Sequence, residues 1–152
     1  MNEMSDKLQQ SYDDLVRQAT KQVENIPPVV ALEMMEKGGA VIIDVRDIRE
    51  LQRDGCIPGS YHVPRGLVES WVDPASEYFK PVFGENHKFL ICCASGRRSA
   101  LTVLTLQNMG IKNACNMVGG FAAWKLLDGD VSGFGDGRHI DLFDPEDQLV
   151  NL

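Results

Sequence analysis

The stretch Phe89-Leu-Ile-Cys-Cys-Ala-Ser-Gly-Arg-Arg-Ser-Ala-Leu101 decides the fold class of this chain. Its first part is an apolar run, which predicts a strand buried on both faces at Lys88–Cys92. A short loop with one glycine follows, and apolar side chains then recur at helical spacing over Ser99–Met109. A buried strand that passes through a short loop into a helix is typical of α/β proteins with a parallel sheet.

The same alternation of strands and helices extends to both sides of this stretch. Further strands are expected at Ala40–Ile43, Tyr61–Val63 and Ala114–Met117, and further helices at Ala31–Lys37, Asp47–Arg53 and Gly119–Leu127. Residues 1–29 predict an amphipathic helix that ends before a Pro-Pro pair, whereas residues 64–87 have no clear pattern. We therefore predict an α/β fold with a central, mostly parallel sheet.

Length and charge indicate the domain organisation and exclude some classes of function. The 152 residues fit one domain, and the formal charge of -7 argues against nucleic acid and anionic membranes as partners. We divide the chain into an N-terminal helical extension at 1–29, a catalytic domain at 30–127 and an acidic, Gly-rich tail at 128–152. The tail holds seven acidic residues and one Arg, so the acidity belongs mainly to the tail. A solvated tail is expected, although apolar residues such as Phe143, Leu149 and Val150 would also allow docking.

The sequence also gives expectations about location, metals and cofactors. The acidic N-terminus does not resemble a secretory signal, and no apolar run approaches the roughly 20 residues that span a bilayer, so a cytoplasmic protein is expected. The four cysteines form no C-x-x-C pair, which argues against a zinc site. No metal and no organic cofactor is expected.

Cysteine at the end of a buried strand suggests a nucleophile. In open α/β sheets, chemistry takes place beyond the carboxyl ends of the strands. Unpaired N–H groups at the start of the following helix favour a negative sulfur, and Arg97 and Arg98 add positive charge beside it. The combination of Cys, Gly and paired Arg between strand and helix therefore favours covalent catalysis by a thiolate.

The segment Cys93-Ala-Ser-Gly-Arg-Arg-Ser99 resembles the active-site loop of the rhodanese (thiosulfate sulfurtransferase) family. Three other segments resemble family motifs in the same order: Val41-Ile-Ile-Asp-Val-Arg46, Gly55-Cys-Ile-Pro-Gly-Ser60 and Val118-Gly-Gly-Phe-Ala-Ala-Trp124. The resemblance covers about residues 30–127 and implies a three-layer fold with helices on both faces of the sheet. Cys56 departs from the pattern, because many members have His at that position.

The resemblance also implies a mechanism and a set of site residues. Cys93 would take a sulfane sulfur from a small anionic donor such as thiosulfate and hold it as a persulfide. A thiol, cyanide or a sulfur-accepting protein would then receive the sulfur. The substrate-binding residues would be those of the loop, with Arg98 favoured over Arg97 for facing the donor: Ala94, Ser95, Gly96, Arg97, Arg98 and Ser99.

Several alternatives stay open at this point. Counted from Cys92, the spacing Cys92-x5-Arg98 is that of cysteine-dependent phosphatases and of relatives that act on phosphate or arsenate. A non-catalytic rhodanese-like binding module is the other alternative. Local expectations are that Arg46 pairs with Glu50 one helical turn away, and that Ser99 caps the helix that follows the loop.

Overall fold

The computed structural model describes residues 8–135 and 140–142 of the chain. Its centre is a six-stranded sheet in the order β1-β5-β4-β2-β3-β6, and every neighbouring pair is parallel. The strands are β1 (Asn25–Ile26), β2 (Ala40–Asp44), β3 (Tyr61–His62), β4 (Lys88–Cys92), β5 (Ala114–Met117) and β6 (Ile140–Asp141). The predicted parallel α/β fold is confirmed.

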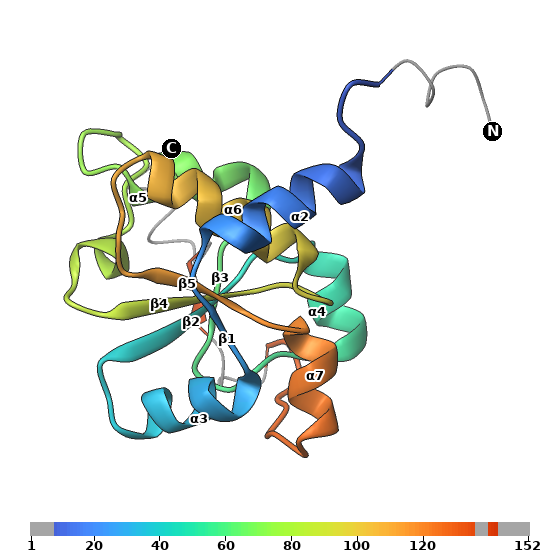
Figure 1. Cartoon of the computed structure of the whole chain (residues 1–152). Helices are drawn as coiled ribbons and strands as arrows, with labels where there is room; N and C mark the ends of the chain where they lie inside the picture. The colour runs from blue at the N-terminus through green and yellow to red at the C-terminus, as the bar shows by residue number, and fades with distance from the viewer. Residues whose placement is uncertain (1–7, 136–139, 143–152) are drawn as a thin grey trace.

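Helices cover both faces of this sheet, so the molecule has the three expected layers (Figure 1). On one face lie α2 (Tyr12–Gln22), α5 (Val68–Val72) and α6 (Arg97–Asn108), and α2 packs directly on α6. On the other face lie α3 (Pro28–Glu36) and α7 (Gly120–Leu126), which contact each other. Helix α4 (Ile48–Asp54) follows β2 at the end of the sheet where β4 leads into α6. The short 3-10 helices η1 (Arg65–Leu67) and η2 (Pro81–Gly84) lie in the region without a clear pattern.

Local sequence explains where several helices begin. Ser11 accepts a hydrogen bond from the Asp14 N–H while the Asp14 carboxylate accepts one from the Ser11 N–H, and this capping box starts α2. Asp47 and Glu50 form the same arrangement at the start of α4. Pro28 occupies the first turn of α3, where its missing N–H has no consequence.

Two apolar clusters, one on each face, enclose the central strands. Buried side chains of β4 divide between them by strand alternation: Phe89 and Ile91 belong to one cluster, and Leu90 and Cys92 to the other. A strand buried on both faces holds the end of β4 rigidly, and the residue that follows it is Cys93.

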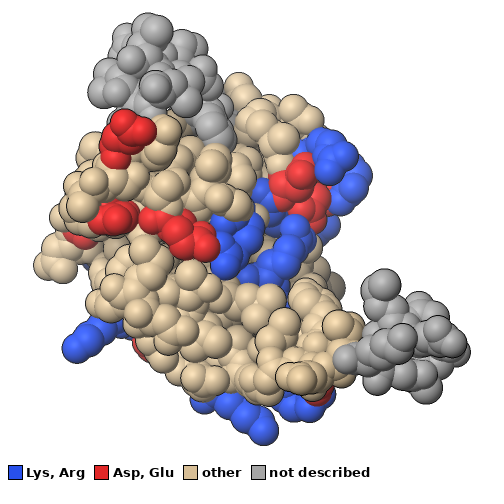
Figure 2. All heavy atoms as spheres, turned by 90° about the horizontal axis from the view of Figure 1, so that it is seen from above, with Lys and Arg blue, Asp and Glu red and all other residues tan. Residues whose placement is uncertain are grey.

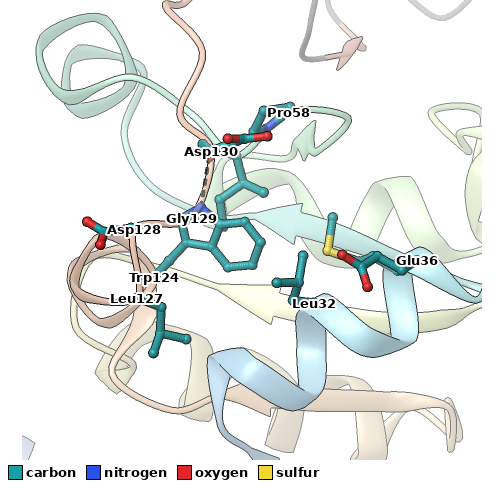
Figure 3. A pocket seen from close by; sticks show the side chains of 10 residues that line it. Leu32, Glu36, Pro58, Trp124, Leu127, Asp128, Gly129 and Asp130 are labelled. Atoms are coloured by element: carbon teal, nitrogen blue, oxygen red, sulfur yellow. Dashed lines mark hydrogen bonds between the residues drawn. The ribbon is translucent and has the colours of Figure 1, made fainter.

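Part of the acidic tail is docked on the domain. Backbone hydrogen bonds join Cys56 and Ser132 in both directions, each with an N···O distance of 2.8 Å. The Trp124 indole N–H donates to the Asp130 carbonyl at 2.9 Å, which the dashed line in Figure 3 marks. Strand β6 extends the sheet beyond β3, and Leu142 is buried against the core. The interpretation of a fully solvated tail is therefore wrong for these residues, whereas Phe143, Leu149 and Val150 lie outside the described residues.

Candidate active site

Cys93 lies directly after β4, in the loop that leads into α6, and several polar groups of that loop point at its sulfur. The Gly96 N–H donates to Cys93 Sγ at 3.1 Å, and the Ser99 N–H reaches the same atom at 3.4 Å. The Ser99 hydroxyl oxygen lies 3.3 Å from the sulfur. The Cys93 side chain is buried, so these groups form the polar surroundings of a desolvated sulfur. Donors aimed at one atom in a site without bulk water are suited to holding negative charge there.

Glycine is needed at position 96 for this loop to close around the sulfur. Gly96 is the N-cap of α6 and has a φ of 89°, a conformation that residues with a Cβ adopt at a cost. A Cβ at this position would lie 2.9 Å from the Gly119 nitrogen. Both the backbone angle and the close neighbour therefore exclude a larger residue.

The backbone that directly follows the Gly119-Gly120 pair is hydrogen-bonded to the loop. The Phe121 N–H donates to the Cys93 carbonyl at 2.8 Å, and the Ala122 N–H donates to the Ala94 carbonyl at 3.1 Å. A Cβ on Gly120 would lie 2.3 Å from the Cys93 carbonyl oxygen. The first turn of α7 thus binds the backbone of Cys93 and of the residue that follows it.

Both arginines of the loop are paired with carboxylates. Arg98 donates through its two terminal nitrogens to the two oxygens of Glu50, each at 2.8 Å, and these hydrogen bonds lower the pKa of Glu50. Arg97 pairs with Asp13 of α2, and its guanidinium lies 4.8 Å from the centre of the Tyr12 ring. Figure 2, which views the molecule from the side of α2 and α6, shows Lys and Arg side chains with Asp and Glu beside them. The positive charge near the loop is therefore tied to two helices, α2 and α4.

The expected pair between Arg46 and Glu50 is wrong. Arg46 is 1% exposed and binds Asp44, with its Nη2 at 2.7 Å from Asp44 Oδ2. The same nitrogen donates to the Gly55 carbonyl at 2.8 Å, and the guanidinium lies 4.2 Å from the centre of the Phe121 ring. A buried arginine needs a buried counter-charge, and among the residues that the structure describes Asp44 is the one buried carboxylate.

Ser99 does not cap α6, because the helix begins at Arg97 and has no side-chain cap. Its hydroxyl donates instead to Asn116 Oδ1 at 2.6 Å. Asn116 is 3% exposed near the end of β5 and was missed by sequence reasoning. A polar residue within an otherwise apolar strand was the available signal, because a buried amide must find partners.

The adjacent Cys92 faces away from the loop donors. Its Sγ contacts the Cys93 carbonyl oxygen at 3.3 Å, and its thiol is fully buried. Burial raises the pKa of Cys92 well above the ordinary value for a thiol, and the Asp44 carboxylate raises it further. Cys56 and Cys115 are also buried, and burial raises the pKa of Cys115 to about 11.

Of the other expected loop residues, Ser95 and Arg97 are exposed and Ala94 is half-buried. Ser95, Gly96 and Arg97 contribute to a shallow groove of about 330 Å³ that α2, β1 and the end of β5 complete. Arg65 pairs with Glu69 of α5 and also donates to the Thr105 hydroxyl of α6. Within the described residues, no helix is long and apolar enough to cross a bilayer.

A second hollow, of about 270 Å³, lies between α3 and α7 (Figure 3). Apolar side chains from both helices and three carboxylates line it: Leu32, Met35, Trp124, Leu127, Glu36, Asp128 and Asp130. None of the residues of the 93–99 loop contributes to this hollow, so it is separate from the candidate site.

The sequence and the fold of this chain are similar to those of known proteins. The family model of the rhodanese-like domain matches residues 28–127. A putative sulfur carrier protein, YrkF, of Bacillus subtilis is 36% identical over 83 residues, which are 55% of this chain and 40% of that protein. A putative mitochondrial thiosulfate sulfurtransferase of Schizosaccharomyces pombe is 36% identical over 91 residues, which are 55% of this chain and 62% of that protein. The chain thus matches about half of these two relatives' length.

Solved structures include a nearer match over the whole fold. A protein of unknown function from Rhodopseudomonas palustris, described as a possible tyrosine phosphatase, is 39% identical with a TM-score of 0.78. The match covers 83% of this chain and 97% of that one, so it extends beyond residues 28–127.

Proposed function

The chain belongs to the rhodanese-like domain family, and we propose from this that it is a sulfurtransferase in which Cys93 carries a sulfane sulfur as a persulfide. The observation that supports the proposal most directly is the convergence of the Gly96 and Ser99 N–H groups on Cys93 Sγ. Names of relatives such as thiosulfate sulfurtransferase agree with it.

The proposed reaction has two steps. The Cys93 thiolate attacks the outer sulfur of a donor such as thiosulfate, a sulfur–sulfur bond to Cys93 forms, and sulfite leaves with the electron pair of the broken bond. In the second step a thiolate or cyanide attacks the terminal sulfur, and Cys93 departs as a thiolate. This course is covalent catalysis with ping-pong kinetics. The N–H donors of the loop stabilise the negative sulfur at both stages.

Within this proposal the two arginines act on the donor in different ways. Arg98 is held by Glu50, so its charge is largely compensated and its main effect is on the start of α6. Arg97 is likewise paired with a carboxylate, Asp13 of α2, but its side chain is 45% exposed against 38% for Arg98. We therefore propose that an anionic donor meets Arg97 first, in place of Arg98, which the sequence favoured. Because Cys93 is buried, a donor can reach its sulfur only after side chains around the loop move aside. The small-molecule partners, a sulfur-accepting protein and the cytoplasmic location remain part of the proposal.

A cysteine-dependent phosphatase is the second candidate, because one similar structure is described as a possible tyrosine phosphatase. That reaction would use either Cys92 with its spacing to Arg98, or Cys93 in the same loop. Cys92 packs into the apolar cluster on the opposite face from Cys93, and its pKa is raised, so the first route is disfavoured. A binding module without activity is the third reading, and it predicts no covalent adduct.

The experiment that tests the proposal is mass spectrometry of the protein after incubation with thiosulfate. We expect the peptide that contains Cys93 to gain the mass of one sulfur atom, and a thiol reductant to remove it. Cys93→Ser should lower sulfur transfer by more than about a thousandfold, as expected for loss of a nucleophile. Cys92→Ser is the matched control and should keep the adduct. An adduct that depends on Cys92, or phosphate ester hydrolysis without any adduct, would refute the assignment.

A further inference from the structure

Asn116 joins the two residues whose N–H groups hold the Cys93 sulfur. Its Oδ1 accepts the Ser99 hydroxyl proton at 2.6 Å, and its Nδ2 donates to the Gly96 carbonyl at 3.3 Å. Gly96 and Ser99 are the residues whose amide nitrogens reach Cys93 Sγ. The Asn116 side chain on β5 thus connects Gly96 and Ser99, and its own hydrogen bonds go to these residues and not to the sulfur.

A residue that precedes the family-matched region 28–127 fixes the orientation of the Asn116 amide. Asn116 Nδ2 also donates to Asn25 Oδ1 at 3.1 Å. The Asn25 amide is fixed in turn, because its Nδ2 donates to the carbonyls of Thr20 at 2.9 Å and Val23 at 3.0 Å. A carbonyl can only accept, so the two carbonyls at the end of α2 determine which atom Asn25 presents to Asn116.

This chain of hydrogen bonds also determines the direction of the Ser99 hydroxyl. With Asn116 Nδ2 facing two acceptors, its Oδ1 must face Ser99, and the single hydroxyl proton points to Asn116. The hydroxyl therefore has no proton to give to Cys93 while that bond is kept. The negative sulfur depends on the two backbone N–H groups, and these depend on Asn116 for their position.

We propose that Asn116, oriented by Asn25, is a positioning residue that holds the Gly96 and Ser99 N–H groups on the Cys93 sulfur. The inference deepens the proposed function, on which its turnover measurements rest. It also assigns a role to residues 8–25, which precede the domain matched by the family: the end of α2 fixes the hydrogen-bond direction in the loop.

The test compares Asn116→Leu with Asn113→Leu. Asn113 directly precedes β5, and its side-chain amide donates to the His87 carbonyl. For Asn116→Leu we expect kcat for thiosulfate to fall about tenfold with KM within about twofold, since donors to a transition-state charge act mainly on kcat. Alkylation of Cys93 by iodoacetamide, followed by mass spectrometry, should slow by a similar factor. Asn113→Leu should change neither rate.

A second pair of variants keeps the test valid if Asn116→Leu does not fold. Asn25 is exposed, so it can be changed without disturbing the core. Asn25→Leu should slow both reactions about threefold, because it removes the acceptor of Asn116 Nδ2. Gln22→Leu is the matched control: it changes another exposed residue at the end of α2, whose side chain donates to the Gln18 carbonyl, and it should stay near the wild-type rates. Ser99→Ala, which keeps the backbone N–H, should cost less than Asn116→Leu.

The outcomes separate this inference from the proposed function. Alkylation uses no sulfur donor, so slow alkylation of Asn116→Leu in a protein without thiosulfate turnover would support the positioning role and refute the function. Equal alkylation and turnover rates for Asn116→Leu and Asn113→Leu would overturn the inference. Where Asn116→Leu does not fold, equal rates for Asn25→Leu and Gln22→Leu would overturn it as well.

Discussion

Replacing Gly120 by alanine tests how closely α7 supports the backbone of the reactive cysteine. Gly120 has a φ of 60°, and the new Cβ would lie 2.3 Å from the Cys93 carbonyl oxygen and 2.8 Å from the Ala94 carbonyl carbon. Both neighbours are backbone atoms, so neither can turn away as a flexible side chain would. We expect the loop and the first turn of α7 to be pushed apart.

The magnitude follows from two separate costs. A residue with a Cβ at positive φ costs about 1–2 kcal/mol. Forced overlap in a packed region adds about 1–3 kcal/mol. Weakening of the bond from the Phe121 N–H to the Cys93 carbonyl, 2.8 Å long, adds about 1 kcal/mol. Gly120→Ala should therefore lower the free energy of unfolding by about 3–6 kcal/mol.

Gly38→Ala is the matched control. Gly38 also has a positive φ, of 77°, but an added Cβ would meet no atom within 4 Å. Only the unfavourable backbone conformation therefore affects Gly38→Ala, and its free energy of unfolding should fall by about 1–2 kcal/mol. Urea unfolding measures both values, and sulfur transfer from thiosulfate should fall more than about tenfold in Gly120→Ala alone. Equal stability losses in the two variants would refute the reasoning.

Three further predictions concern the charged groups around the loop. Arg98→Ala should lower the unfolding free energy by about 1 kcal/mol at neutral pH, a value reduced for solvent screening because the pair is partly exposed. Arg98 lowers the pKa of Glu50. The stabilisation by this pair is therefore present above the pKa of Glu50 in the unfolded state and is lost as pH falls through its pKa in the folded state. A stability loss in Arg98→Ala that is larger in acid than at pH 7 would contradict this. Asp13→Asn should release Arg97 and lower KM for thiosulfate about twofold with little change in Tm, since exposed pairs contribute little to stability; an increase in KM would contradict this. Arg46→Met should cost about 3–5 kcal/mol in urea unfolding, because it leaves a buried carboxylate without its partner; a loss below about 1 kcal/mol would contradict this.

The contrast between Arg46 and Arg98 shows where reasoning from sequence spacing fails. Glu50 lies one helical turn from Arg46, so spacing along the chain favours that pair. In the structure Glu50 binds Arg98, which is 48 positions away, and Arg46 binds Asp44 in the interior. Neither choice depends on sequence distance. Arg46 is buried and therefore binds the buried carboxylate of Asp44. Glu50 binds Arg98 because α4 packs beside the start of α6.

Asn25 and Asn116 show the same limit for uncharged groups. They are 91 positions apart and meet only because β1 pairs with β5 in parallel, with Asn25 opposite Asn116. No local pattern predicts such a pair, since strand partners are chosen by the arrangement of the whole sheet. The polar residue within an apolar strand is a signal that a partner exists, but not which one it is.

The sequence by itself determined the strand–loop–helix unit around Cys93, the parallel α/β fold and the family resemblance, because alternating apolar runs and the order of short motifs are local properties of the chain. It also located the Gly-Gly pair before Trp124, although not what that pair supports. Only the tertiary structure decided which thiol faces the loop donors, which carboxylate each arginine binds, and that Asn116 lies behind the sulfur site. The physical reason is that a buried polar group takes the partner that three-dimensional packing brings within about 3 Å, wherever that partner lies in the chain.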